Sequence, residues 1–167
     1  VLEAFRSAHP QHELAPDATR KLAVAYLESG RTQQAAIELE RVATLAGEDG
    51  EIRRTALWQA AELYVGANDR AAATRAYATY VERYPAPHAA AIDARQALAD
   101  LARDSGDTSG RRRWLEEVIA ADAAAGSQRT DRSRYLAAHG ALELARPHDD
   151  LARAIKLTVP LDQSLLA

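Results

Sequence analysis

Apolar side chains recur at helical spacing in segments that glycine, asparagine and proline separate from one another. In the segment that begins at Pro16, the positions Leu22, Ala23 and Tyr26 lie on one face of a helix with 3.6 residues per turn. Stripes of the same kind occupy about residues 32–46, 51–67, 70–84, 88–104, 108–125 and 130–145. Short loops between such segments are typical of antiparallel helical hairpins. The pattern therefore predicts an all-α chain of paired helices.

Residues at the segment boundaries are of the kinds that begin and end helices. Side-chain oxygens suited to the N-cap position are carried by Thr32, Asp69 and either Asp107 or Thr108. Residues that suit the left-handed backbone after a last helical turn are Gly30, Asn68 and Gly106. Pro147 is predicted to open a final pair of helices, which Pro160 separates.

The whole pattern repeats every 38 residues. Pairs of apolar and small residues in the first helix of each unit start at positions 22, 60, 98 and 136, and they are Leu22-Ala23, Ala60-Ala61, Leu98-Ala99 and Leu136-Ala137. A small residue follows early in the second helix, at Ala35 and Ala73, with Arg111 in that place in the third unit. A fixed period with small and large residues in register predicts a stack of hairpins that cover one another's apolar faces.

With these residues in place, the chain resembles the tetratricopeptide repeat family over about residues 16–145. The second unit carries the resemblance best, through Ala60-Ala61, Tyr64, Ala73, Tyr77 and Pro85. The resemblance implies a right-handed superhelix of antiparallel helical hairpins, whose concave groove binds a partner segment. The stretch from Ala73 to Leu101 contains Tyr-Val-Glu-Arg-Tyr-Pro at residues 80–85, followed by a helix expected to begin near His88. This stretch is similar to tetratricopeptide proteins of the bacterial cell envelope, including outer-membrane assembly lipoproteins and division-coordination proteins. This similarity implies a periplasmic or envelope location, with the cytoplasm as the alternative.

The period divides the chain into three regions. Residues 1–15 are expected to form an N-terminal helix and linker. The repeats are expected to occupy residues 16–53, 54–91, 92–129 and, in part, 130–145. Residues 146–167 are expected to be divergent C-terminal helices, cut short within a larger bacterial protein.

Composition agrees with helical hairpins and removes several other classes of protein. Of the 167 residues, 39 are Ala, whereas only 7 are Val and 5 are Ile. This balance argues against a sheet fold, because Ala favours helices and β-branched residues favour strands. The net charge is −3, so nothing global attracts the chain to nucleic acid or to an anionic membrane. The sequence has no Cys, which excludes disulfides and thiol catalysis.

The concave-face residues can be placed by their spacing around the first helix of each unit, on the side away from the second helix. This reasoning predicts a partner-binding set of Arg20, Val24, Leu27, Trp58, Glu62, Gln96, Asp100, Arg103 and Arg134. Trp58 stands out, because aromatic and arginine side chains anchor protein partners. The alternative for Trp58 is packing against a neighbouring hairpin as part of the core.

We therefore expect a protein–protein interaction scaffold that binds a protein or peptide partner. A second hypothesis is a structural spacer or oligomerisation segment of a longer repeat protein, which self-associates through exposed repeat ends. A weaker third hypothesis is a nucleic-acid-binding repeat, suggested by six arginines within residues 111–134. No catalytic motif, metal-ligand spacing or apolar run of membrane-spanning length is visible. We accordingly expect no enzyme activity, no cofactor, no metal, no nucleic acid partner and no direct membrane span.

Overall fold

The computed structural model describes residues 1–154, and these residues fold entirely into helices and connecting loops. The elements are α1 (Leu2–Ala8), α2 (Ala15–Glu28), α3 (Thr32–Val42), α4 (Gly50–Gly66), α5 (Arg70–Arg83), α6 (His88–Asp104), α7 (Thr108–Ala124), the short 3-10 helix η1 (Gly126–Gln128) and α8 (Asp131–Ala154). Within this part of the chain there is no strand. The predicted all-α class is confirmed.

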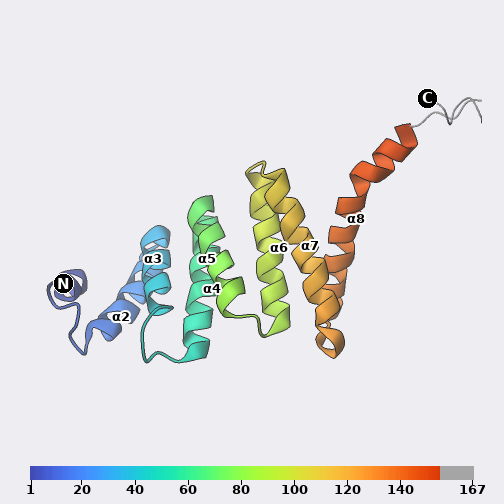
Figure 1. The fold of residues 1–167 in the computed structure, drawn as a ribbon. Helices are drawn as coiled ribbons and strands as arrows, with labels where there is room; N and C mark the ends of the chain where they lie inside the picture. Colours follow the sequence, from blue (N-terminus) through green and yellow to red (C-terminus); the bar gives the residue numbers. More distant parts are fainter. Residues whose placement is uncertain (155–167) are drawn as a thin grey trace, which may run out of the picture.

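The helices follow one another in space in the order of the sequence. Each helix from α1 to α7 packs against the next, and α6 also contacts α8. Figure 1 shows the result as a row of upright helices from the N-terminal end (blue) to α8 (orange and red). Short loops turn the chain between neighbours, so each apolar face is covered mainly by residues close in sequence.

The second helices of the first three units begin in strict register. They begin at Thr32, Arg70 and Thr108, which are 38 residues apart each time. The preceding residues Gly30, Asn68 and Gly106 have φ values of 70°, 58° and 75°. The next N–H in each unit donates to a carbonyl five residues earlier, namely Arg31 to Tyr26, Asp69 to Tyr64 and Asp107 to Ala102. This is the helix ending that a left-handed residue permits, so the predicted turns are confirmed.

Two of the predicted N-caps are confirmed and one is wrong. The Asp69 carboxylate accepts from the N–H of Ala72 at 3.0 Å, and the Asp107 carboxylate accepts from the N–H of Gly110 at 2.8 Å. Thr32 instead lies inside the first turn of α3, and no side chain caps that helix. Arg31 takes the N-cap place, and the Thr32 hydroxyl donates instead to the Gly30 carbonyl at 3.5 Å.

Small residues lie where the helices approach most closely. Ala23, Ala61, Ala99 and Ala137 are between 0% and 7% exposed, and Ala35 and Ala73 are fully buried. Larger side chains fill the space around these alanines, including Leu57, Tyr77 and Leu98 in one continuous core cluster. The high alanine content is therefore partly positional, because a larger side chain at these sites would push neighbouring helices apart.

The predicted final pair of helices is wrong in its first member. Pro147 does not open a new helix but lies inside α8, which runs on to Ala154. A proline inside a helix removes one hydrogen bond and bends the axis. The neighbouring Leu, Ala and Arg residues favour helix strongly enough to continue on both sides. Figure 1 shows the C-terminal part of α8 leaning away from α7. The expectations about Pro160 and the rest of residues 155–167 lie outside the described residues.

An ion pair holds the N-terminal helix to the first hairpin. Arg6 of α1 donates to the Glu38 carboxylate of α3, with one N–O distance of 2.8 Å. The Glu38 side chain is only 6% exposed. Close contact with Glu38 raises the pKa of Arg6 through the hydrogen bond. A buried carboxylate on α3 thus fixes where α1 packs.

Candidate binding groove

An apolar cavity of about 360 Å³ lies between α2 and α4, and we call it the α2–α4 groove. Leu39 and Val42 of α3 form its buried floor, together with Ala23 and Ala56. The remaining lining residues come from the two flanking helices, and they are Arg20, Val24, Leu27, Glu51, Ile52, Thr55 and Gln59. The groove is therefore built from one hairpin and the first helix of the next.

Three large apolar side chains remain exposed around this groove. Val24 is 53% exposed, Leu27 is 43% exposed and Ile52 is 47% exposed. Val24 and Leu27 are three residues apart on α2, and Arg20 lies one turn before Val24, so the three share one helix face. Exposed apolar side chains that gather on a concave surface are typical of a binding site.

Local capping sets the position of Ile52 on the opposite wall. The Asp49 carboxylate accepts from the N–H of Glu51 at 2.7 Å and from that of Ile52 at 3.3 Å. These bonds fix the first turn of α4 and direct its side chains toward α2. Sequence reasoning missed Ile52. The spacing rule for the concave face considers only positions close to the Ala60-Ala61 pair in the middle of the helix, and Ile52 lies in its first turn. Asp49 before an apolar residue was the available signal.

Arg20 forms the polar edge of the groove. Its guanidinium pairs with Asp17 one turn earlier on α2 and with Glu48 in the loop before α4. The hydrogen bond to Glu48 is the largest reason that the pKa of Arg20 is raised, followed by the bond to Asp17. The pair with Glu48 therefore links α2 to the loop that leads into α4, at one end of the groove.

Trp58 lies elsewhere, and the expectation that it faces away from the second helix of its own hairpin is wrong. The Trp58 ring stands edge-on to Tyr77 at 5.5 Å and to Tyr80 at 5.2 Å, both on α5. Edge-to-face pairs of this kind are stabilising, and they draw the half-buried indole onto the core. Trp58 thus packs at the edge of the core on the second helix of its own hairpin, and not on the neighbouring hairpin that the alternative interpretation named.

The other predicted residues do not join Arg20, Val24 and Leu27. Glu62 lies exposed on α4, away from the lining of the groove. On α6, Gln96 donates to Asp100 at 3.4 Å, and Arg103 pairs with Asp100 at 3.0 Å. Arg134 pairs with Asp131 at 3.3 Å at the start of α8. The predicted set is therefore divided among the groove, the core edge, α6 and α8.

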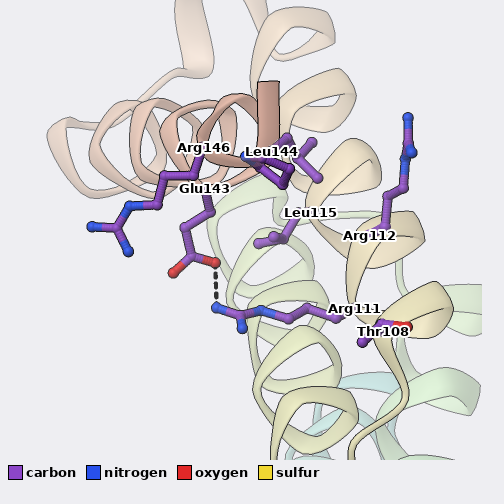
Figure 2. Close-up of a pocket in the computed structure, with 8 residues that line it drawn as sticks. Thr108, Arg111, Arg112, Leu115, Glu143, Leu144 and Arg146 are labelled. Atoms are coloured by element: carbon purple, nitrogen blue, oxygen red, sulfur yellow. Dashed lines mark hydrogen bonds and ion pairs between the residues drawn. The ribbon is translucent and has the colours of Figure 1, made fainter. Parts of the chain in front are cut away.

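A second cavity, of about 410 Å³, lies between α7 and the C-terminal part of α8, and we call it the α7–α8 wedge. It is lined by Thr108, Arg111, Arg112, Leu115, Glu143, Leu144, Arg146 and Pro147. Figure 2 shows Arg111 reaching across to Glu143, while Leu115 and Leu144 lie between the two helices. Arg111 stands where earlier units carry a buried alanine, so its departure from the repeat supplies the ion pair that joins α7 to α8.

The arginines of residues 111–134 are engaged within the protein. Besides Arg111, ion pairs join Arg112 to Glu116, Arg129 to Asp122, Arg132 to Asp93 and Arg134 to Asp131. Arg113 lies 4.7 Å from the centre of the Trp114 ring, in cation–π contact. The cluster thus forms a salt-bridged surface distributed over three helices.

A buried carboxylate sets the direction of α8. Asp122 is 1% exposed, and it accepts from the Ser133 hydroxyl at 2.6 Å and from Arg129 at 2.5 Å. Thr130 and Ser133 also exchange two hydrogen bonds of 3.0 Å, which close the first turn of α8 as in a capping box. The bond from Arg129 is the largest reason that the pKa of Asp122 is lowered, and the bond from Ser133 lowers it further. The network joins α7, η1 and α8 and so fixes one side of the wedge.

Among residues 1–154, no helix combines the length and hydropathy needed to cross a bilayer. In the same residues, no three His or acidic side chains gather in a way that suits a metal ion. Searches of family models, curated proteins and solved structures returned no match to this chain, so its relation to the tetratricopeptide family stays a prediction from the residues.

Proposed function

We propose that the chain is a non-enzymatic scaffold of tetratricopeptide type, a right-handed superhelix of hairpins, that binds an apolar segment of a partner protein in the α2–α4 groove. The observation that carries this proposal is the meeting of Val24, Leu27 and Ile52 above a floor of buried apolar residues. When a partner buries apolar side chains that the chain's own fold leaves exposed, their removal from water stabilises the complex.

The lining indicates what the partner segment presents. Its centre is apolar, and charged residues occur at the edges, with Arg20 on one wall and Glu51 on the other. A groove between two helices suits an amphipathic helix that inserts residues such as Leu, Ile or Phe. We therefore propose a helical or extended segment with two or three apolar side chains on one face, flanked by polar residues.

The repeat supports the scaffold part of the proposal. Three second helices begin 38 residues apart, with the same left-handed turn before each. Small buried residues recur at equivalent places, as stacked hairpins require. Units that pack mainly on their sequence neighbours leave long side surfaces open to partners.

The engagement of the arginines supports a protein partner over a nucleic acid. Nucleic acid binding draws its affinity from basic side chains that reach phosphates. Here the arginines of residues 111–134 contact carboxylates or an indole within the chain. A basic surface neutralised in this way offers little attraction to a phosphate backbone.

One observation favours the second hypothesis, that of a structural or self-associating segment. On α8, Tyr135, Leu142 and Leu151 are 65%, 59% and 68% exposed. Tyr135 and Leu142 are seven residues apart on one face of α8, and Leu151 lies on another face. Exposed apolar residues of this kind are typical of a helix that packs on a further element. The two roles are compatible, because the groove and α8 lie in different parts of the row (Figure 1).

Peptide selection on the purified chain tests the groove. Peptides from a random 12-residue library are enriched on the wild-type chain, labelled, and titrated by fluorescence anisotropy. Val24→Asp and Leu27→Asp are expected to weaken binding by about tenfold or more, since each removes an apolar contact of roughly 1.5–3 kcal/mol. Val65→Asp is the matched control, because Val65 is 47% exposed on α4 and outside the groove. Selected peptides that bind Leu27→Asp as tightly as wild type would place the site elsewhere.

We propose the bacterial cell envelope as the compartment, on the resemblance to envelope repeat proteins. Fractionation of cells that express the full-length protein with a C-terminal epitope tag tests this proposal. Recovery of the tag in the cytosolic fraction alone would contradict it.

A further inference from the structure

The charged side chains of the α2–α4 groove lie at one end of it. Its two charged lining residues are Arg20 on α2 and Glu51 on α4. Because Arg20 pairs with Glu48 in the loop just before α4, Arg20 and Glu51 lie at the same end. The lining residues that follow on each helix, up to Leu27 on α2 and Gln59 on α4, carry no charge. The groove therefore has a charged end and an uncharged end.

Carboxylates outnumber guanidinium groups at the charged end. Arg20 is shared between Asp17 and Glu48, so one positive charge faces two negative charges there. Glu51 pairs with Arg54 at a long N–O distance of 3.4 Å, and its side chain remains 77% exposed. Even with Arg54 counted, three carboxylates face two guanidinium groups. A negative charge is therefore left over, and Glu51 is the most exposed of the three carboxylates.

The excess negative charge of the whole chain lies in the part that contains this groove. Residues 1–67, which include α1 to α4, hold 10 acidic and 7 basic side chains. Residues 68–167 hold 14 of each kind. The net charge of −3 thus belongs to the first part of the chain. A negative field of this kind attracts basic segments toward the groove, and salt screens the attraction.

We propose that the partner segment held in the α2–α4 groove carries a lysine or arginine that pairs with Glu51, next to the apolar residues that contact Leu27 and Ile52. The inference rests on the proposed partner binding, to which it adds the charge of the segment and its direction. Ile52 follows Glu51 directly on α4, so the basic residue lies beside the apolar residue that contacts Ile52. Since the other end of the groove is uncharged, the basic residue stands on one fixed side of the apolar residues.

The ion pair supplies specificity more than affinity. Glu51 stays close to water, and an exposed ion pair contributes little free energy, so the apolar contacts provide most of the binding. A segment with Asp or Glu in the same place brings a further negative charge to an end that already has an excess of carboxylates. The charged end therefore favours a basic segment and disfavours an acidic one.

Charge reversal at Glu51 tests this preference on the purified chain. Peptides from the random library are enriched separately on the wild type and on Glu51→Lys, and both pools are sequenced. The wild-type pool is expected to hold more Lys and Arg than Asp and Glu beside its apolar residues, and the Glu51→Lys pool the reverse. Glu62→Lys is the matched control, because Glu62 is an exposed carboxylate on α4 outside the lining. It is expected to enrich the wild-type pool. The same preference on the wild type and on Glu51→Lys would overturn the inference.

Titration of one peptide from the wild-type pool measures the size of the effect. At about 150 mM salt, Glu51→Gln is expected to weaken binding by about two- to fivefold and Glu51→Lys by about tenfold. Replacing the basic residue of the peptide with Glu is expected to weaken binding to the wild type and to restore binding to Glu51→Lys within about twofold of the original pair. Failure of this exchanged pair to recover would show that the basic residue does not contact Glu51.

A second peptide of identical composition tests the direction in the groove. Its basic residue is moved to the opposite side of the apolar residues, so its net charge is unchanged. It is expected to bind the wild type about two- to fivefold more weakly than the original peptide and to lose nothing further in Glu51→Gln. Equal affinity of the two peptides would overturn the assigned direction.

The outcomes distinguish this inference from the proposed function. Peptides that lose affinity in Leu27→Asp but not in Glu51→Lys would keep the groove as the binding site and overturn its preference for basic segments. Peptides that bind Leu27→Asp as tightly as the wild type would overturn the groove as the site, and this inference with it. Glu51 lies in the exposed first turn of α4, so its variants are expected to fold, and circular dichroism of each variant verifies this.

Discussion

The Arg6 guanidinium and the Glu38 carboxylate meet across 32 positions of sequence, with Nη2 and Oε1 2.8 Å apart. Glu38 is nearly buried on α3, while Arg6 lies on α1 and retains 16% side-chain exposure. The pair is the main polar contact between the N-terminal helix and the first hairpin. Its removal leaves a charge in a place that water reaches poorly.

Arg6→Met is therefore expected to lower the free energy of unfolding by about 1–3 kcal/mol, the cost of an unsatisfied buried acceptor. Urea unfolding followed by circular dichroism measures this change. Arg41→Met is the control, because Arg41 is 51% exposed and contacts the same carboxylate at 3.5 Å. It is expected to cost under about 1 kcal/mol, as exposed ion pairs usually do. Equal losses in the two variants would mean that the Arg6–Glu38 pair contributes no more to stability than the exposed contact of Arg41.

Acid unfolding is expected to depend on Asp122. The hydrogen bond from Arg129 lowers the pKa of Asp122 in the folded chain. The stabilisation is therefore fully present above the ordinary carboxyl pKa of about 4, and it is lost as the pH falls through the lower folded value. Asp122→Asn is expected to unfold more easily at pH 7, by about 1–3 kcal/mol, and to show a smaller further loss below pH 4. Denaturant midpoints between pH 2 and pH 7 measure both effects.

The control for Asp122 is Asp131→Asn, since Asp131 is fully exposed and makes a single pair with Arg134. Its pH profile is expected to match that of the wild type. If the denaturant midpoint of Asp122→Asn falls below pH 4 as steeply as that of the wild type, other carboxylates are responsible for the acid sensitivity.

Alkaline pH is expected to unfold the chain through Tyr77. Burial raises the pKa of the Tyr77 hydroxyl to about 12, with a smaller contribution from Glu62. The folded chain holds this proton more tightly than the unfolded chain, so stability is complete below pH 10 and is lost as the pH rises from 10 through 12. Tyr77→Phe is expected to shift the alkaline midpoint upward, as measured by circular dichroism between pH 9 and pH 12. Tyr135→Phe, at a site 65% exposed, is expected to leave the midpoint where it is.

Enlarging a buried alanine tests the close approach of the helices. Ala73 on α5 is fully buried, whereas Ala71 in the same helix is exposed. Ala73→Leu is expected to cost about 1–3 kcal/mol through overpacking, and Ala71→Leu is expected to be nearly neutral. Thermal unfolding of the two variants gives the comparison. A neutral Ala73→Leu would show that the helices separate without cost at this crossing.

Trp58 distinguishes a core side chain from a binding residue. Trp58→Ala removes the ring that packs on Tyr77 and Tyr80, so it is expected to lower the free energy of unfolding by about 2–3 kcal/mol. Affinity for a peptide selected on the α2–α4 groove is expected to stay within about twofold of wild type, provided that the measurement is made well below the melting temperature. A large loss of affinity with unchanged stability would return Trp58 to the partner-binding set.

Helix existence and most helix ends could be predicted from the sequence, because local signals determine them. Asp69 and Asn68 illustrate this, since a cap and a left-handed turn need only a few neighbouring residues. Pro147 shows the limit of the same reasoning. The bend that a proline causes is local, but whether the helix continues past it depends on flanking residues and on packing against α7.

The candidate site was less predictable, because it depends on how helices rotate against one another. Arg20, Val24 and Leu27 were found, since three residues on one helix face stay together whatever the packing. Ile52 comes from another helix, and the rotation of that helix follows from the cap at Asp49. The prediction for Trp58 is wrong for a related reason. Its spacing assigns it to the side of α4 away from α5, but the indole is long enough to reach Tyr77 on α5.

The matching turns at Gly30, Asn68 and Gly106 have a consequence for how this chain tolerates changes in length. After each of these turns a second helix begins, and the starts of these helices are 38 residues apart. One residue inserted into a helix rotates everything beyond it by about 100° and turns the buried alanines to the surface. In contrast, insertion of a complete 38-residue unit, from one of these turns to the next, keeps every later alanine on the buried face of its helix. Complete hairpins can therefore be added to the row or removed from it, by gene duplication or by engineering, without a change in how the remaining helices pack.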